Sequence, residues 1–234
     1  MVRMLRILPL IPVLAAFGLF VASCGTDHAQ LRFVHASPNA PNVDITVDSK
    51  SFATDIPYAS FAPSSGYSSF NSGNRNLQVF VTGTTTNPLI DSNLNLSGGK
   101  QYTVLASGLE SSIAAVLVTD NNTQPSSGKV NLRVIHDSPS AAGHLDIYLV
   151  SPGTDITNIT PNASALAYQQ ASGYFSMTAG SIELIATVTG DGTKTRIIDQ
   201  TYSLTAGQVR TFVLLDVPGS GFLSPTPLEL ADLN

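Results

Sequence analysis

Hydrophobic and polar residues alternate with a period of two through several short segments of this chain. Residues 43–47 and 77–81 each place apolar side chains on one face and mostly polar side chains on the other. This alternation predicts half-buried β-strands. Residues 31–37 and 102–106 also have strand composition, and the second of these is mostly apolar, which favours a central position. Turn signals rich in Gly, Pro and Asn recur roughly every ten residues, the spacing of an antiparallel sandwich or barrel.

The chain contains two tandem copies of one sequence unit. The pattern of residues 31–47 returns in the same order at residues 132–149, with one inserted residue near Gly143. Downstream matches keep nearly equal spacing: Tyr67 with Tyr174, Gly73 with Gly180, Asp91 with Asp199, and Thr103 with Thr211. Each copy has about 100 residues, a common domain size.

These patterns predict an all-β protein with two tandem immunoglobulin-like antiparallel β-sandwich domains after an N-terminal signal peptide. The expected divisions are a lipoprotein signal peptide at residues 1–23, a tether at 24–30, a first sandwich at 31–120, a linker at 121–129 and a second sandwich at 130–234. The linker is polar and contains Pro and Gly, as linkers often do.

The N-terminal segment has the three parts of a secretory signal peptide. Residues 1–6 carry two arginines and no acid, residues 7–20 are apolar, and small residues follow. The apolar run is short for a membrane-spanning helix, which needs about 20 residues. A buried N-terminal helix or a permanent anchor is the less favoured alternative.

The end of this segment, Val-Ala-Ser-Cys at residues 21–24, resembles the lipobox of bacterial lipoproteins. The resemblance implies cleavage before Cys24, diacylation of its thiol, and a membrane anchor through lipid on Cys24. Several acyl chains would give stable anchoring, whereas one chain gives only marginal affinity. We therefore expect a place in the bacterial cell envelope, on the outer membrane or the outer face of the cytoplasmic membrane.

Charge excludes some partners. The formal net charge is −5, and removal of Arg3 and Arg6 with the leader makes it −7. Nucleic-acid binding requires a face rich in Lys and Arg, so no nucleic-acid partner is expected. Docking on anionic lipid through basic residues is disfavoured for the same reason.

A strand followed by His-x-Ser-Pro, then Val/Leu-Asp-Ile, a Tyr, a Gly turn and a late Gly-x-x-x-Thr resembles the domain-of-unknown-function family 4397. The resemblance covers nearly all of residues 31–234. Members are mostly bacterial envelope or secreted proteins, often with tandem copies. The resemblance therefore implies a fold and a location, and it brings no established activity.

The repeated motif supplies the candidate site residues. They are His35, Ser37, Pro38 and Asp44 in the first copy and His136, Ser138, Pro139 and Asp146 in the second. One interpretation is a metal or acid–base site, but zinc needs three or four ligands and each copy offers two, with His144 as an extra in the second copy only. The favoured interpretation is structural: each histidine bonds an aspartate or a turn amide and pins the turn to the neighbouring strand. No metal, cofactor or catalytic residue is expected.

Two other recurring pairs have both binding and structural interpretations. Arg32 and Arg133 could form an anion site, but pairing with a nearby Asp or stacking on Tyr is favoured. Tyr67 and Tyr174 could line a carbohydrate platform, but core packing with the hydroxyl at the edge is favoured. No G-x-S-x-G, phosphate-loop, EF-hand or H-E-x-x-H motif occurs.

The sequence thus favours a non-catalytic binding or structural module that displays β-sandwich loops to a protein or glycan partner. The alternative is an envelope hydrolase or metal-dependent enzyme that uses the repeated His and Asp residues. The loops that differ between the copies, notably residues 151–162, are the preferred location for a functional surface.

Overall fold

The computed structural model describes residues 28–141, 143–218, 221–224 and 226–233. Cys24 and the expected leader lie outside the described residues. Nearly all regular elements in the described part are β-strands, joined by turns and two short 3-10 turns. No helix within these ranges has the length and apolar character needed to cross a membrane.

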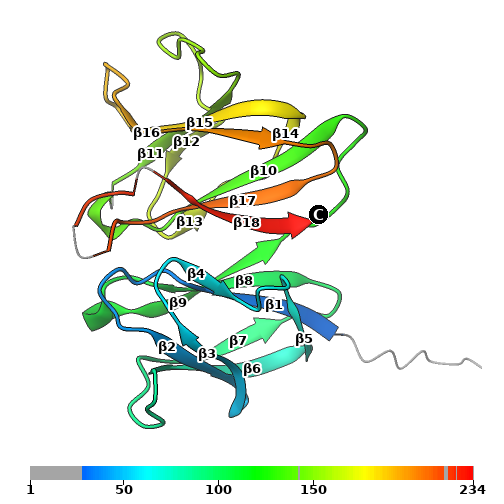
Figure 1. Ribbon diagram of the computed structural model, residues 1–234, viewed down its shortest axis with the longest axis vertical. Coiled ribbons are helices and arrows are strands. Elements are labelled where there is room, and N and C mark those ends of the chain that lie inside the picture. Colours follow the sequence, from blue (N-terminus) through cyan, green and yellow to red (C-terminus); the bar gives the residue numbers. More distant parts are fainter. Residues whose placement is uncertain (1–27, 142, 219–220, 225, 234) are drawn as a thin grey trace, which may run out of the picture.

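The first copy of the unit, called here the first repeat, contains nine strands in two sheets. The strands are β1 (His28–His35), β2 (Val43–Val47), β3 (Lys50–Ile56), β4 (Ser60–Ala62), β5 (Ser68–Asn71), β6 (Gly73–Val81), β7 (Ile90–Leu96), β8 (Gln101–Ser107) and β9 (Ala114–Asp120). One sheet has the order β4-β1-β8-β9, with β5 also paired to β1, and the other has the order β3-β2-β6-β7. The two sheets pack face to face as a sandwich (Figure 1).

The second repeat has the same topology. Its strands are β10 (Lys129–His136), β11 (Leu145–Val150), β12 (Ala163–Leu166), β13 (Gln170–Ala171), β14 (Phe175–Thr178), β15 (Gly180–Val188), β16 (Arg196–Leu204), β17 (Val209–Leu214) and β18 (Leu228–Leu233). Its sheets have the orders β13-β10-β17-β18, with β14 paired to β10, and β12-β11-β15-β16. The prediction of two tandem immunoglobulin-like β-sandwiches is confirmed.

One strand pair in each repeat departs from the predicted antiparallel pattern. Strand β1 runs parallel to β8, and β10 runs parallel to β17. Parallel neighbours need a long crossover connection. Here the chain passes through the whole second sheet between the two strands. Alternation alone could not reveal this, because it reports which face is buried and not the direction of a neighbour.

The sheets that contain β1 and β10 are buried on both faces. Leu31 and Phe33 of β1 face the core of their own sandwich, while Val34 belongs to a third apolar cluster shared by the two repeats. The other fully enclosed members of this third cluster are Ala36, Leu105, Ile135, Val213, Leu215 and Leu230. The two sandwiches therefore stack through these sheets as four layers (Figure 1).

Candidate functional site

The repeated histidine lies at a corner where the chain leaves one sheet and enters the other. His35 ends β1 and is fully buried. Its Nε2 donates to the carbonyl oxygen of Pro41 at 3.0 Å, and its Nδ1 lies 3.4 Å from the amide nitrogen of Ser37, which donates to it. The ring of Tyr58 meets the imidazole edge-on, with centroids 6.0 Å apart. The imidazole thus holds the turn between β1 and β2 closed.

His136 occupies the matching corner of the second repeat. Its Nε2 lies 2.8 Å from the carbonyl oxygen of Ala141, and Tyr168 packs edge-on against the ring. Burial lowers the pKa of both His35 and His136, and hydrogen bonds to turn carbonyls oppose this effect only partly. Both rings are therefore neutral near pH 7, and their hydrogen bonds run to the turn rather than to the repeated aspartates.

The repeated aspartates lie on the next strand and bind backbone amides. Asp44 accepts the amide of Asp55 at 2.8 Å and the amide of Gly83 at 2.9 Å, and these two bonds lower its pKa. Asp146 accepts a backbone amide and a threonine hydroxyl, both at 2.8 Å. Across the described ranges, no group of three or more His, Cys, Asp and Glu side chains is placed to hold a metal ion.

The Ser-Pro pairs begin the two corner turns but differ in their contacts. Ser37 is buried, and its hydroxyl has no hydrogen-bond partner among the described residues. Ser138 is also buried, and its hydroxyl donates to Asp216. Pro38 lies in the first turn, whereas Pro139 opens a short 3-10 turn. The two serines therefore share a position without sharing a chemical role.

Replacing His35 with alanine is expected to reduce the free energy of unfolding by about 1–3 kcal/mol, because the turn loses two hydrogen bonds and a packed ring. Since burial lowers the pKa of His35, its protonation destabilises the native state as the pH falls below about 6.5, and the variant should lose this part of the acid sensitivity. Denaturant unfolding at several pH values measures both effects. The exposed His144→Ala variant is the control, and stoichiometric metal that disappears with His35 would contradict the structural role.

Arg32 extends from β1 into the interface between the repeats. Its Nη2 donates to Asp232 of β18 at 2.6 Å and to the hydroxyl of Thr103 at 2.8 Å. Its guanidinium lies over the ring of Tyr67, 4.7 Å from the centroid. The arginine of the first repeat is thus neutralised by a carboxylate of the second.

Arg133 makes the reciprocal set of contacts. Its Nη2 donates to Asp120 of β9 at 2.5 Å and to the hydroxyl of Thr211 at 2.9 Å, and its guanidinium lies over Tyr174. Each threonine hydroxyl then donates to the aspartate of its own repeat, at 2.7 Å in the first and 2.6 Å in the second. The bonds close a circuit, the interface charge ring, formed by Arg32, Thr103, Asp120, Arg133, Thr211 and Asp232.

Burial and the charges of the ring shift the pKa values of Arg32 and of the two tyrosines stacked on the arginines. Burial alone lowers the pKa of Arg32, but the charges of Asp232 and its neighbours outweigh burial and leave this pKa raised. Burial raises the pKa of Tyr67 and Tyr174, which donate to Asp120 and Asp232. The predicted Asp pairing and Tyr stacking of the arginines are both present. The sequence did not reveal that each carboxylate comes from the other repeat.

Another polar contact across the interface has no counterpart at the symmetry-related position. The hydroxyl of Ser107 donates to Asp137, and Gln169 donates to that hydroxyl at 2.9 Å. Asp137 is 1% exposed, and burial raises its pKa to about 7. The matching positions of the pseudo-symmetric interface hold apolar residues, Ala36 and Leu215. The only sequence signal was the change from His-Ala-Ser-Pro to His-Asp-Ser-Pro.

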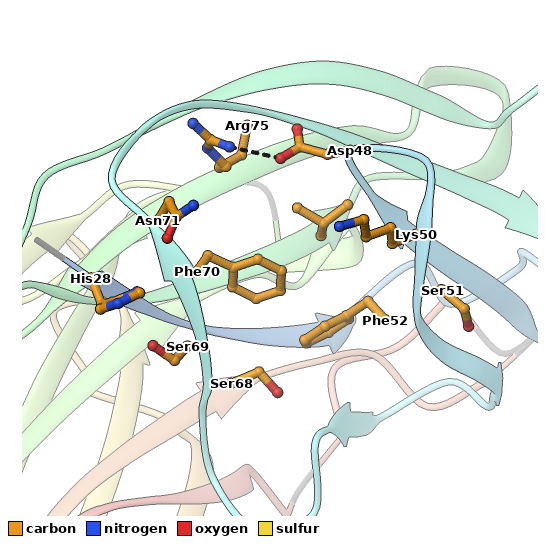
Figure 2. Close-up of a pocket in the computed structure, with 11 residues that line it drawn as sticks. His28, Asp48, Lys50, Ser51, Phe52, Ser68, Ser69, Phe70, Asn71 and Arg75 are labelled. Carbon is orange, nitrogen blue, oxygen red and sulfur yellow. Dashed lines mark hydrogen bonds and ion pairs between the residues drawn. The ribbon is translucent and has the colours of Figure 1, made fainter. Parts of the chain in front are cut away.

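An open pocket of 540 Å³ lies on the first repeat, between β3 of one sheet and β5 of the other. Figure 2 shows the rings of Phe52 and Phe70 side by side at its floor. Their centroids are 5.7 Å apart, and the rings are tilted by 49°. Arg75 and Asp48 form an ion pair of 2.9 Å at the rim, and Asn71 lies beside them. Sequence reasoning missed this pocket, because its aromatic residues come from separate weakly patterned strands.

Solved structures give distant fold similarities. A carbohydrate-binding module of family 26 from Eubacterium rectale, crystallised with maltoheptaose, shares 14% identity over 85% of this chain and 97% of its own, with a TM-score of 0.26. The Bacillus anthracis TIE protein shares 7% identity over 81% of this chain and 34% of its own, with a TM-score of 0.28. This chain thus spans about a third of the anthrax protein. A streptococcal ancillary pilin shares 10% identity over 90% of this chain and 60% of its own, with a TM-score of 0.22.

Comparison of the sequence with protein families identifies the family of the chain, which the structural similarities do not. No curated protein matches the chain. The family model described as "Domain of unknown function (DUF4397)" matches residues 29–148, which is slightly more than half of the chain and includes both copies of the His-x-Ser-Pro corner. The chain therefore belongs to the DUF4397 family.

Proposed function

We propose that this protein is a lipid-anchored component of the bacterial cell envelope and acts as a non-catalytic binding and structural module. The observation that carries the proposal is the use of the repeated polar residues. His35 and His136 close turns, Asp44 and Asp146 bind backbone groups, and the repeated arginines join the two sandwiches. These repeated residues stabilise the scaffold. The binding surface is therefore expected where the two copies differ.

The interface charge ring supports a rigid scaffold. A buried polar network with satisfied members fixes one arrangement of its elements, since any other arrangement leaves a buried charge without a partner. Arg32 and Asp120 have fully buried side chains, and the apolar cluster around Val34 and Ile135 surrounds the same interface. Two sandwiches held in this way present their outer loops at fixed separations.

The anchor belongs to the proposal through the lipobox-like residues that end at Cys24. Three residues separate Cys24 from His28, where β1 begins, and the four steps between them reach about 14 Å at most when extended. A lipid on Cys24 would therefore hold the first repeat close to the membrane surface.

Metabolic labelling with a fatty-acid analogue tests the anchor. The wild-type chain is expected to carry the label, and the Cys24→Ser variant is expected to lose it completely and to leave the membrane fraction. The control is Cys24→Ser combined with Ser65→Cys, which restores a thiol in an exposed turn. This control should also remain unlabelled, and undiminished label in Cys24→Ser would reject the anchor.

Affinity capture on intact envelopes, with the whole chain as bait, tests the binding role. We expect a retained protein or glycan whose capture is unaffected by a chelator and whose covalent structure is unchanged afterwards. Turnover of the captured molecule, or capture that requires a metal ion, would reject the non-catalytic module in favour of the hydrolase or metal-dependent alternative.

A further inference from the structure

The pocket of the first repeat combines an apolar floor with a polar rim. Phe52 and Phe70 are half-buried, pack against the sandwich core, and still line the open space. Hydroxyl, amide and charged groups of Ser69, Asn71 and Lys50 stand around them (Figure 2). The volume of 540 Å³ falls within the range of about 300–1,000 Å³ that is typical of small-ligand sites.

The aromatic pair is specific to the first repeat. The strand registers place Phe70 opposite Ala29, and in the second repeat Met177 lies opposite the matching Val130. Phe52 precedes Ala53, the partner of Ile45, and the corresponding place in the second repeat belongs to Asn162. Asn162 is committed to the scaffold there, because its side chain accepts the amide of Leu149. Since the fold tolerates other residues at both places, it does not require the two phenylalanines.

The local backbone disfavours a peptide strand as the ligand. A peptide that adds to a sheet needs a regular exposed edge with free backbone groups in register. Strand β3 is an edge strand, but its pairing with β2 shifts register twice between Val43 and Thr46. Strand β5 offers only four residues. The pocket also spans the gap between β3 of one sheet and β5 of the other, so it does not follow the edge of either sheet.

The charges of the rim are partly balanced, because Arg75 and Lys50 both interact with Asp48, and this disfavours a strongly anionic ligand. Arg75 donates to Asp48 at 2.9 Å, and the other oxygen of Asp48 accepts the amide of Asn76 at 3.0 Å. The guanidinium is therefore already paired, and it fixes the rim instead of offering a free charge. Two flat rings below mixed donors and acceptors suit a ligand with one apolar face and several hydroxyl groups.

We propose that this pocket binds a neutral saccharide, with a sugar ring stacked on Phe52 and Phe70 and its hydroxyls bonded to the rim. The inference rests on the proposed binding function and names its ligand class. The apolar C–H face of a pyranose covers aromatic carbon, while Ser69 and Asn71 supply the few polar contacts that orient a ligand in such sites. The location beside His28 places the pocket at the end of the first repeat where β1 begins.

Calorimetric titration of the whole chain, purified in detergent, tests the proposal. The probes are a glucose oligosaccharide, an N-acetylglucosamine oligosaccharide and an acidic galacturonate oligosaccharide. We expect one neutral probe to bind with an affinity that does not change between low and high salt. Phe52→Leu combined with Phe70→Met should weaken this binding at least tenfold. This variant keeps apolar cover over the core, and methionine already occupies the second position in the other repeat.

Two further variants separate loss of the site from loss of the fold. Asn71→Ala changes an exposed rim residue and should weaken binding at least threefold with an unchanged unfolding midpoint. Phe175→Leu changes a half-buried aromatic residue of the second repeat and should leave binding unchanged. Absence of binding to both neutral probes, or binding of the acidic probe alone, would overturn the proposal. Binding undiminished in the double variant would also overturn it, while leaving the binding role itself intact.

Discussion

Replacing Asp120 with alanine is expected to reduce the free energy of unfolding by about 3–5 kcal/mol, because the change leaves a buried arginine without its carboxylate. Asp120 accepts three bonds: from Arg133 at 2.5 Å, from Thr103 at 2.7 Å and from Tyr67 at 2.8 Å. Arg133 and Thr103 are buried, and both would be left without this acceptor. Denaturant unfolding followed by circular dichroism measures the loss.

Two comparison variants show that the loss comes from the interface charge ring. Glu229→Gln breaks an ion pair with Arg210 whose carboxylate is 41% exposed, and pairs of this kind contribute little. Its effect should therefore be much smaller. Replacing Asp120 with leucine together with Arg133 by methionine should recover most of the lost stability, because removal of both charges leaves neither one buried alone. A loss in Asp120→Ala no larger than that in Glu229→Gln would show that the ring does not hold the repeats together.

Replacing Asp137 with asparagine is expected to change how stability depends on pH. The pKa of Asp137 is raised from 3.8 to about 7 in the folded chain, chiefly by burial and further by the nearby charge of Asp216. The folded state therefore binds more protons than the unfolded state between these values, and the free energy of unfolding falls as the pH rises through them. A pKa shift of this size changes the free energy of unfolding by about 4 kcal/mol, since each pKa unit corresponds to about 1.36 kcal/mol.

The measurement is the difference in unfolding free energy between the wild type and Asp137→Asn at pH 4 and at pH 8. At pH 4 the side chain at position 137 is neutral in both folded proteins. At pH 8 only the folded wild type carries a buried charge there. The asparagine variant should thus gain about 4 kcal/mol relative to the wild type across this interval. Contributions from other carboxylates, such as the hydrogen-bonded Asp44, are common to both proteins and cancel. A difference that stays constant with pH would contradict the shifted pKa.

The strand pattern and the duplicated architecture could be predicted because each follows from local chemistry. Alternation in residues 43–47 and 77–81 reports which face of a strand is buried, and those faces do form the sandwich cores. The weakly patterned region before Phe70 contains two further short strands, one on each side of the turn at residues 64–66.

The interface could not be predicted because it depends on pairing between distant residues. Arg32 and Asp232 are 200 positions apart, and no periodicity links them. One sequence feature does indicate the interface: the face of the first strand that points away from the sandwich core is similar in the two repeats. Arg32 and Val34 recur as Arg133 and Ile135, although a solvent-exposed face would be free to vary.

The interface charge ring has the geometry of an isologous contact, in which the same patch of two equivalent units meets itself about a two-fold axis. An arginine on the first strand of each repeat meets an aspartate on the last strand of the other. This is the arrangement of a symmetric homodimer whose two subunits have been joined into one chain. Fusion removes the need for the two halves to be identical. The halves can therefore differ, as they do at the Ser107–Asp137 contact and at the aromatic pair of Phe52 and Phe70. The covalent link thus lets one half specialise while the other preserves the shared contact.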